Sequence, residues 1–357
     1  MKLIKIVIGF GLSFLMVLFV LDQFVNLANI QDPSLNDFDT VLGRKRRANL
    51  RFTCFNEGFA VGRFNDYGYL GPGYPEKREK DHLRIAILGD SYVESFQLFR
   101  RDQFHAIIEN ELSISVGKVV EVLNFGRSGF DFADMYVYQK RFVDRFKPDL
   151  IIYMISDEDL ACTQKDPLIP KVVDRGGDLV ITNDQISKRY LYPFQKTKTV
   201  RQNSSIVTIL NNCRKLIQAG ELWPKLLGKF YRERAQKQEQ GLTDSVRRPV
   251  SPLALKVLAQ LSANVVVVNR GTKAFDGAFM QEIDRKEIPF FRTKDTLEVL
   301  EKKGIDPYYW PVTQTRGHWN YTAHRAVGFY LSRRLDDLLR HRLERKELSS
   351  KESLPLQ

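Results

Sequence analysis

The most informative stretch of this chain reads Arg84-Ile85-Ala86-Ile87-Leu88-Gly89-Asp90-Ser91. Its first five residues are largely apolar without a polar alternation, which is typical of a strand covered on both faces of a sheet. The glycine that follows permits a tight turn. In open parallel sheets, ligands bind outside the carboxyl ends of the strands. The sequence therefore predicts that Ser91 lies at the functional edge of an α/β sheet.

Four more apolar runs follow this strand, at residues 119–123, 150–155, 265–268 and 288–291. Amphipathic stretches with helical spacing separate several of them. One begins after Asp131, a good helix N-cap, and another after Asn320. Alternating strands and helices indicate a parallel sheet with helices on both faces. We expect an α/β fold, a three-layer αβα sandwich around a central parallel sheet of about five strands.

The N-terminus has the pattern of a membrane segment. Lys2 and Lys5 precede an uncharged run at residues 6–21, and Asp22 ends it. With the flanking apolar residues, this run approaches the ~20 residues that cross a bilayer. Because no convincing small-x-small cleavage site follows, we favour an uncleaved membrane anchor at residues 1–27 over a signal peptide. The lysines would stay in the cytoplasm and the rest of the chain would lie outside.

The remaining chain divides by composition. Residues 28–80 form a turn-rich connector, and residues 81–340 carry the strand–helix rhythm. Residues 165–250 interrupt that rhythm between the third and fourth strands, so we interpret them as an insertion and a possible lid over the site. Residues 341–357 are expected to be a polar, frayed tail.

Composition narrows the function classes. The 357 residues are 43% hydrophobic and 27% charged, as in ordinary globular proteins, which excludes a wholly disordered chain. The net charge of +12 suits an anionic polymer or membrane surface, or is simply a basic solvated surface. No nucleic-acid-binding pattern appears. The three cysteines include no C-x-x-C pair, so neither a disulfide framework nor a metal site is expected.

Three features near predicted strand ends carry candidate chemistry. Ser91 is a nucleophile only if a base activates it; otherwise it is a turn serine that caps a helix. His318 precedes the last helix and follows a loop, where a neutral imidazole is well placed to be that base. The glycines of Gly126-Arg127-Ser128-Gly129 allow backbone N–H groups to approach a ligand or simply form a tight turn.

Together these blocks resemble the SGNH/GDSL hydrolase superfamily over about residues 65–339. The chain is most similar to membrane-anchored bacterial members associated with cell-surface polysaccharide. The resemblance implies that Ser91 is the nucleophile, that His318 is the general base and that the N–H of Gly129 belongs to the oxyanion hole. It also implies a single-pass protein of the bacterial inner membrane whose catalytic domain faces the periplasm.

The sequence departs from the family pattern at two positions. Glu158 stands where the family places an oxyanion-donating asparagine, and an ionised carboxylate there would repel an oxyanion. Arg316 and Thr315 stand where the triad aspartate is expected. A backbone carbonyl of Thr315 or its neighbour would then leave a Ser–His dyad, with Asp306 as a more distant acid.

Two functions remain open from the sequence. The first is a membrane-anchored serine esterase or O-acyltransferase that acts on acetyl esters of extracytoplasmic carbohydrate with a Ser91–His318 dyad and no cofactor. The second is a catalytically degenerate member that binds glycan or scaffolds a polysaccharide export or modification complex. Retention of both Ser91 and His318 favours the enzyme, because a binding protein has no chemical need for the pair.

Overall fold

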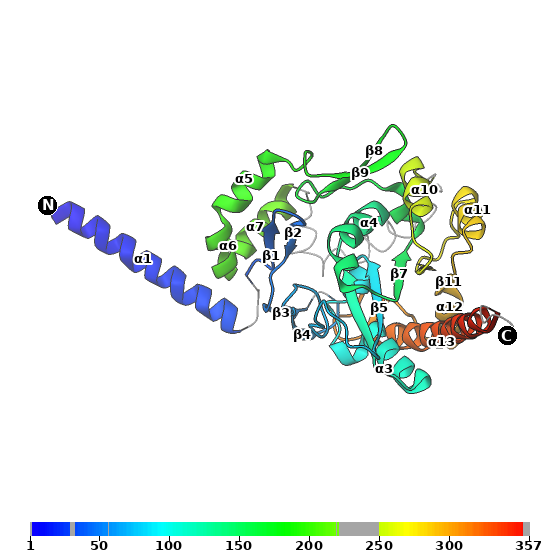
Figure 1. Ribbon diagram of the computed structural model, residues 1–357. Coiled ribbons are helices and arrows are strands. Elements are labelled where there is room, and N and C mark those ends of the chain that lie inside the picture. The colour runs from blue at the N-terminus through cyan, green and yellow to red at the C-terminus, as the bar shows by residue number, and fades with distance from the viewer. Residues whose placement is uncertain (1, 29–32, 56, 219, 221–249, 353–357) are drawn as a thin grey trace. The chain divides into compact units, whose positions relative to one another are not determined.

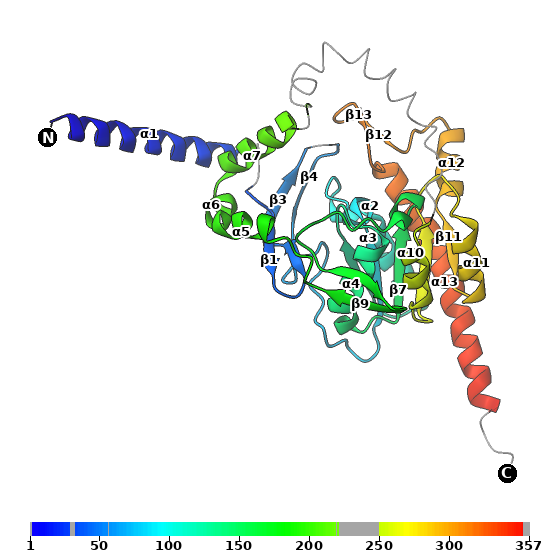
Figure 2. The ribbon, with the colours of Figure 1, turned by 90° about the horizontal axis from the view of Figure 1, so that it is seen from above.

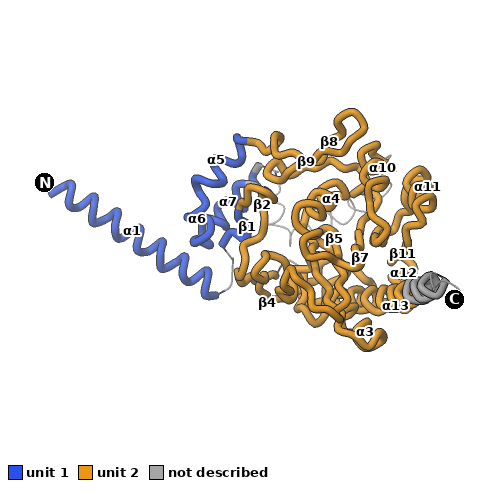
Figure 3. The backbone as a smooth tube through the Cα atoms, in the orientation of Figure 1, with its two compact units in different colours: residues 1–37, 188–247 blue, residues 38–187, 248–357 orange. Residues whose placement is uncertain are grey.

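The structure is a computed structural model that describes residues 2–28, 33–55, 57–218, 220 and 250–352. The chain forms two compact units, coloured separately in Figure 3. The first comprises Met1–Asp37 and Lys188–Arg247, and the second comprises Phe38–Ser187 and Arg248–Gln357. The predicted sheet and all the candidate site residues belong to the second unit.

The core of the second unit is a five-stranded sheet in the order β11-β10-β7-β5-β6, parallel throughout (Figure 1). Its strands are β5 (Leu83–Gly89), β6 (Val120–Gly126), β7 (Leu150–Ile155), β10 (Val265–Asn269) and β11 (Phe290–Arg292). Each of the five apolar runs in the sequence contributes one strand. The predicted parallel sheet of about five strands is confirmed.

Alternate residues of each strand enter two separate hydrophobic cores, one on each face of the sheet. In β5, Ala86 and Leu88 pack with one core, while Ile85 and Ile87 pack with the other. The first core is completed by α4 (Phe132–Arg141), α10 (Pro252–Ala259) and α11 (Gly277–Arg285). The second is completed by α3 (Phe104–Val116), α12 (Lys294–Lys302) and α13 (Tyr321–Glu352). This is the expected three-layer αβα sandwich, and it explains the apolar strands without alternation.

The strand order has its switch point at the end of β5. The chain leaves β5 for β6 on one side and later returns from β6 to β7 on the other side. The connecting helices α3 and α4 therefore cover opposite faces. Such a switch point opens a gap between the loops at the carboxyl edge, where open α/β sheets bind ligands.

The segment between the first helix and the sheet is more structured than a connector. It contains two pairs of short strands, β1 (Asn36–Asp39) with β2 (Gly43–Arg46) and the antiparallel β3 (Arg51–Cys54) with β4 (Ala60–Arg63). Elsewhere, β8 (Lys171–Arg175) pairs antiparallel with β9 (Asp178–Thr182), and β12 (Tyr309–Trp310) with β13 (Thr315–Arg316). Short helical turns complete the unit: α2 (Ser91–Glu94), η1 (Arg100–Asp102), η2 (Val143–Phe146) and η3 (Asp157–Ala161).

The first unit is helical. It contains α1 (Lys2–Leu27), α5 (Lys188–Lys196), α6 (Lys198–Asn203) and α7 (Ser205–Gln218), and α1 contacts α7. Helix α1 is long and apolar enough to cross a membrane, with a mean hydropathy of 2.6 over its most apolar part. A signal sequence passes the same test. Residues 221–249 of the predicted insertion lie outside the described residues.

The C-terminal segment differs from the expected frayed tail. Helix α13 continues as far as Glu352. Residues 341–352 contain no glycine or proline and are rich in arginine, leucine, glutamate and lysine, all of which favour helix. Polarity alone therefore did not mark the end of the helix.

A buried ion pair joins β5 and β6 near the start of the sheet. Arg84 is fully buried, and its Nε donates to Glu121 Oε2 at 2.6 Å. Its Nη1 also donates to the carbonyl of Phe146 at 2.8 Å. Removing Arg84 takes the guanidinium away from the buried carboxylate of Glu121, which keeps His82 Nδ1 at 2.9 Å, whereas replacing both members with apolar residues removes both charges.

We predict that Arg84→Met lowers the free energy of unfolding by about 3–5 kcal/mol because it removes the guanidinium that compensates the buried carboxylate of Glu121. The double variant Arg84→Met/Glu121→Leu should lie closer to wild type. Urea unfolding of the full chain in detergent, followed by near-ultraviolet circular dichroism, measures both. Equal losses in the single and double variants would contradict this account.

Candidate active site

Ser91 is presented at the carboxyl end of the first sheet strand. β5 ends at Gly89 and α2 begins at Ser91, with Asp90 as its N-cap. The Asp90 carboxylate accepts a hydrogen bond from the backbone N–H of Tyr92 at 3.0 Å, which fixes the turn. As the first residue of a helix, Ser91 has a backbone N–H with no acceptor inside that helix.

His318, which comes from near the C-terminal end of the sequence, contacts Ser91. It lies between β13 and α13, and its Nε2 is 2.7 Å from Ser91 Oγ. Its backbone carbonyl accepts a hydrogen bond from Trp310 Nε1 at 3.0 Å. The Tyr92 ring lies beside the imidazole, with 4.6 Å between ring centroids. The two residues that the sequence paired by resemblance are therefore in direct hydrogen-bond contact.

A carboxylate stands behind the histidine. Glu57, in the segment between β3 and β4, places Oε1 2.8 Å from His318 Nδ1. Its Oε2 accepts hydrogen bonds from the backbone N–H of His318 and from Gln97 Nε2, each at 3.1 Å. Gly317 makes this approach possible, because a Cβ there would lie 2.2 Å from Glu57 Oε1.

The electrostatics of Glu57 suit an ionised partner. Burial alone would raise the pKa of Glu57, but the hydrogen bonds and charge of His318 outweigh burial and lower the pKa below its usual value. An ionised Glu57 accepts a hydrogen bond from the protonated Nδ1 of His318. The unprotonated Nε2 is then free to accept a hydrogen bond from the Ser91 hydroxyl. The arrangement is a Ser–His–Glu chain of hydrogen bonds.

The expected Ser–His dyad thus has a third member that sequence reasoning missed. Arg316, in the family's usual acid position, instead pairs with Asp306 at 2.8 Å. Glu57 precedes Ser91 in the chain and lies in the segment expected to be a connector. No sequence pattern marks Glu57, and the close packing around it is visible only in the structure, where a Cβ at the neighbouring Gly58 would collide with Trp310 and the carbonyl of Gln97.

The predicted oxyanion loop lies against the nucleophile turn. β5 and β6 pair in register up to Gly89 and Gly126, and the backbone N–H of Arg127 donates to the carbonyl of Gly89 at 2.9 Å. Gly129 follows in the same loop with φ of +86°, a conformation that favours glycine. The assignment of the Gly129 N–H to the oxyanion hole stays a prediction.

A buried ion pair fixes this loop to the catalytic helix. Glu94, the last residue of α2, is 2% exposed and accepts hydrogen bonds from the backbone N–H of Ser128 at 2.8 Å and from its hydroxyl. Arg46 of β2 holds the same carboxylate in a bidentate pair, through Nε at 2.7 Å and Nη2 at 2.9 Å. Burial tends to raise the pKa of Glu94, but Arg46, Arg127 and the hydrogen bond from Ser128 together outweigh burial and lower the pKa.

Glu158 does not share these contacts. It is solvent-exposed on η3, and no hydrogen bond joins it to Ser91 or Gly129 within the described part of the chain. Its neighbour Asp159 is buried, and burial together with Asp90 raises the pKa of Asp159 to about 7. Arg270 bridges these two acids, at 2.5 Å from Asp90 and 3.3 Å from Asp159. An oxyanion or substrate role for Glu158 stays a prediction.

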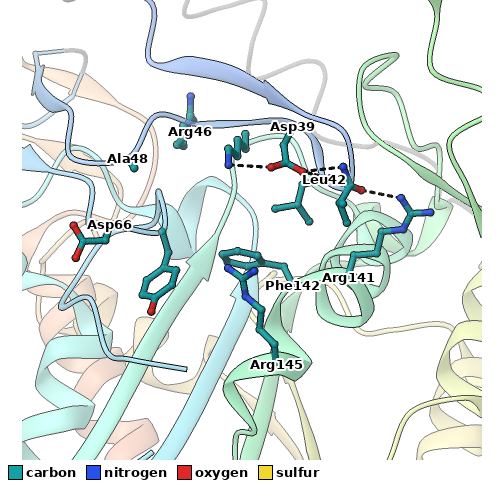
Figure 4. A pocket seen from close by; sticks show the side chains of 11 residues that line it. Asp39, Leu42, Arg46, Ala48, Asp66, Arg141, Phe142 and Arg145 are labelled. Atoms are coloured by element: carbon teal, nitrogen blue, oxygen red, sulfur yellow. Dashed lines mark hydrogen bonds and ion pairs between the residues drawn. The ribbon is translucent and has the colours of Figure 1, made fainter. Parts of the chain in front are cut away.

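Arg46 is one of the residues that line a cavity of about 210 Å³ (Figure 4). None of Ser91, His318 and Glu57 lines it. Its basic lining side chains are held by carbonyls and acids: Lys45 bonds to Asp39, and Arg141 donates to the carbonyl of Val41. Arg46 thus lines this cavity and also binds the carboxylate of Glu94.

We predict that Glu94→Ala lowers kcat by about 10²-fold with little change in KM, because the oxyanion loop loses the acceptor that positions it. The double variant Arg46→Met/Glu94→Gln keeps an acceptor for Ser128 while it removes both charges of the pair, and it should retain kcat within about tenfold. Steady-state ester hydrolysis, with thermal unfolding as a control for folding, measures both. An unchanged kcat in Glu94→Ala would contradict the positioning role.

Comparisons with known proteins find fold similarity. No protein-family model matches the chain, and no curated protein matches it. Among solved structures, a lipase/acylhydrolase from Enterococcus faecalis is 10% identical with a TM-score of 0.38, over 71% of this chain and 96% of the other. A putative lipolytic protein of the G-D-S-L family from Desulfitobacterium hafniense is 9% identical with a TM-score of 0.31, over 70% and 98% of the two chains.

A catalytic mutant of an acetylxylan esterase from Geobacillus stearothermophilus is 14% identical with a TM-score of 0.34, over 70% of this chain and 93% of the other. Because these TM-scores are below 0.5, we infer no activity from them. The parallel five-stranded sheet with helices on both faces is the three-layer α/β fold that the sequence predicts.

Proposed function

We propose that this chain is a serine esterase or O-acyltransferase that forms an acyl-enzyme on Ser91. The observation that carries the proposal is the continuous chain of hydrogen bonds from Ser91 Oγ through His318 to Glu57, at 2.7 and 2.8 Å. A serine hydroxyl needs an adjacent base, and that base needs an orienting group, to act as a nucleophile. The missing local aspartate no longer weakens the enzymatic interpretation.

In the first half-reaction, Ser91 Oγ attacks the ester carbonyl carbon while His318 Nε2 takes the hydroxyl proton. The carbonyl oxygen becomes an oxyanion, which the backbone N–H groups of Ser91 and Gly129 are proposed to stabilise. The ionised Glu57 stabilises the imidazolium and holds its orientation. The C–O bond to the leaving alcohol then breaks, and the alcohol departs with the proton from His318.

In the second half-reaction, a water molecule or an acceptor hydroxyl gives its proton to His318 Nε2 and attacks the acyl carbon. Collapse of the second tetrahedral intermediate breaks the bond to Ser91 Oγ, which recovers the proton. Water gives a carboxylic acid and a hydroxyl acceptor gives a new ester. The same residues therefore serve hydrolysis and transfer, and access of the acceptor decides between them.

We place this chemistry outside a bacterial inner membrane, on acetyl esters of carbohydrate. The apolar helix α1 supports a single membrane span, and Lys2 and Lys5 at its start favour a cytoplasmic N-terminus. The similarity of the sequence blocks to membrane-anchored members associated with cell-surface polysaccharide supports the substrate class. The net charge of +12 is compatible with an anionic glycan.

The test is turnover of a small activated acetyl ester by the full chain in lipid bilayer discs. We predict that Ser91→Ala and His318→Ala abolish turnover and that Glu57→Gln lowers kcat by about 10²–10⁴-fold, because the imidazole loses its orienting charge. An acetylated oligosaccharide, with and without a free sugar acceptor, then distinguishes hydrolysis from transfer.

Asp306→Asn is the matched control. Asp306 was the acid that the sequence offered, but it pairs with Arg316, and asparagine keeps the acceptor for the backbone N–H of Tyr308. Its activity should equal wild type. Loss of activity in Asp306→Asn with full activity in Glu57→Gln would overturn the assignment of the acid. A folded wild-type protein without turnover of either ester would favour the glycan-binding alternative.

A further inference from the structure

The helical part of the first unit has an unusual charge composition. Residues 185–220 contain seven lysines and arginines but no aspartate or glutamate. Five of them lie in α5 and α6: Lys188, Arg189, Lys196, Lys198 and Arg201. Lys198 is neutralised by Asp37 at 2.6 Å, whereas Lys188, Arg189 and Lys196 are exposed. A solvated surface usually mixes both signs of charge, so this segment suits an anionic partner.

Apolar and aromatic side chains are exposed in the same segment. Tyr190 and Tyr192 of α5 are 53% and 64% exposed, between the basic residues. On α7, Leu210 and Ile217 are each 62% exposed. They are seven residues apart and so share one helix face. Basic residues combined with exposed tyrosine and leucine are typical of helices that lie in a membrane–water interface.

Hydrogen bonds tie the start of α7 to α1. Asp22, directly after the uncharged run of α1, is buried and accepts from the backbone N–H of Ile206 at 2.8 Å and from Ser204 Oγ at 2.9 Å. Ile206 lies in the first turn of α7 and Ser204 immediately precedes that helix, and a carboxylate is electrostatically favourable at a helix N-terminus. Helix α7 contacts α1, and Figure 2 shows α7 beside the C-terminal end of α1.

We propose that α5, α6 and α7 form an interfacial platform that binds the anionic headgroups and outer acyl region of the bilayer that α1 spans. The contact with Asp22 places the start of α7 at the depth where the apolar run of α1 ends. The exposed lysines and arginines then face lipid phosphates, while Tyr190, Tyr192 and Leu210 enter the boundary with the acyl chains. The platform rests on the proposed membrane span of α1, but not on the esterase activity.

The test uses the full chain in lipid bilayer discs, with a fluorophore on single cysteines introduced by Tyr192→Cys or Leu210→Cys. Cys54 and Cys213 are replaced by serine, and Ile114→Cys in α3, 80% exposed, is the matched control. We expect nitroxide lipids to quench positions 192 and 210 by about half and aqueous iodide to quench them weakly. Position 114 should show the reverse.

A comparison of anionic and zwitterionic lipids tests whether the platform needs its positive charges. Discs that contain phosphatidylglycerol should give stronger lipid quenching at position 192 than discs of phosphatidylcholine alone. The triple variant Lys188→Gln/Arg189→Gln/Lys196→Gln should lose that difference. Lys118→Gln/Lys302→Gln/Lys303→Gln, which removes the same charge from exposed positions of the second unit, should keep it.

One result would overturn the platform while leaving the span of α1 intact. In it, the protein resists alkaline extraction, but iodide and not lipid quenches positions 192 and 210. Release of the protein by alkaline extraction would instead overturn the span and the platform together. Shielding of position 192 by a soluble polyuronate, but not by lipid, would assign the surface to an anionic glycan and overturn the proposal. Ester turnover in the same samples reports separately on the active site.

Discussion

The imidazole of His318 contacts a serine hydroxyl and a carboxylate at the same time. The second unit has to bring three distant segments of the chain together to make these contacts. His318 meets Ser91 at 2.7 Å and Glu57 at 2.8 Å, although the three residues come from distant parts of the chain. The loop that carries His318 is closed by Asn320, whose Nδ2 donates to the carbonyls of Asp306 and Tyr309, each at 2.8 Å. The asparagine of this sequence block therefore has a structural task, since it fixes the point where α13 begins and thereby the imidazole.

The second constraint is a buried charge pair that is costly unless its geometry is nearly complete. Desolvating Glu94 and Arg46 is unfavourable, and their attraction offsets that cost only when further hydrogen bonds satisfy both groups. The bidentate contact and the donors of Ser128 satisfy the carboxylate. The pair links β2, α2 and the loop of Gly129, so the element before the sheet sets the position of the loop after β6. A hydrophobic contact would not specify that geometry as tightly, because it has no direction.

Much of the fold could be predicted from the sequence because buried parallel strands leave a strong local signal. Each of the five apolar runs became one strand, and Asp131 caps α4 as expected. Ser91 and His318 were proposed from the sequence because one follows a strand, the other precedes a helix and their blocks resemble a known family, and the structure brings the two side chains together. Glu57 was not found, because an acid in an irregular segment has no periodicity to mark it and acts only through a contact across 261 positions of the chain. The end of α13 was misjudged because polar residues were equated with fraying.

The location of Glu57 extends the proposed catalytic domain toward the N-terminus, to the strand pairs before the sheet. The sheet with its covering helices supplies Ser91 and His318, and a chain that begins at the first sheet strand would keep both. The acid and the support of the oxyanion loop, however, come from the two strand pairs that precede the sheet. Glu57, which contacts His318, and Arg46, which pairs with Glu94, therefore lie between the apolar helix and the sheet. That segment belongs to the site, and changes in it are expected to act on the chemistry through His318 and Ser128 instead of through the stability of the core.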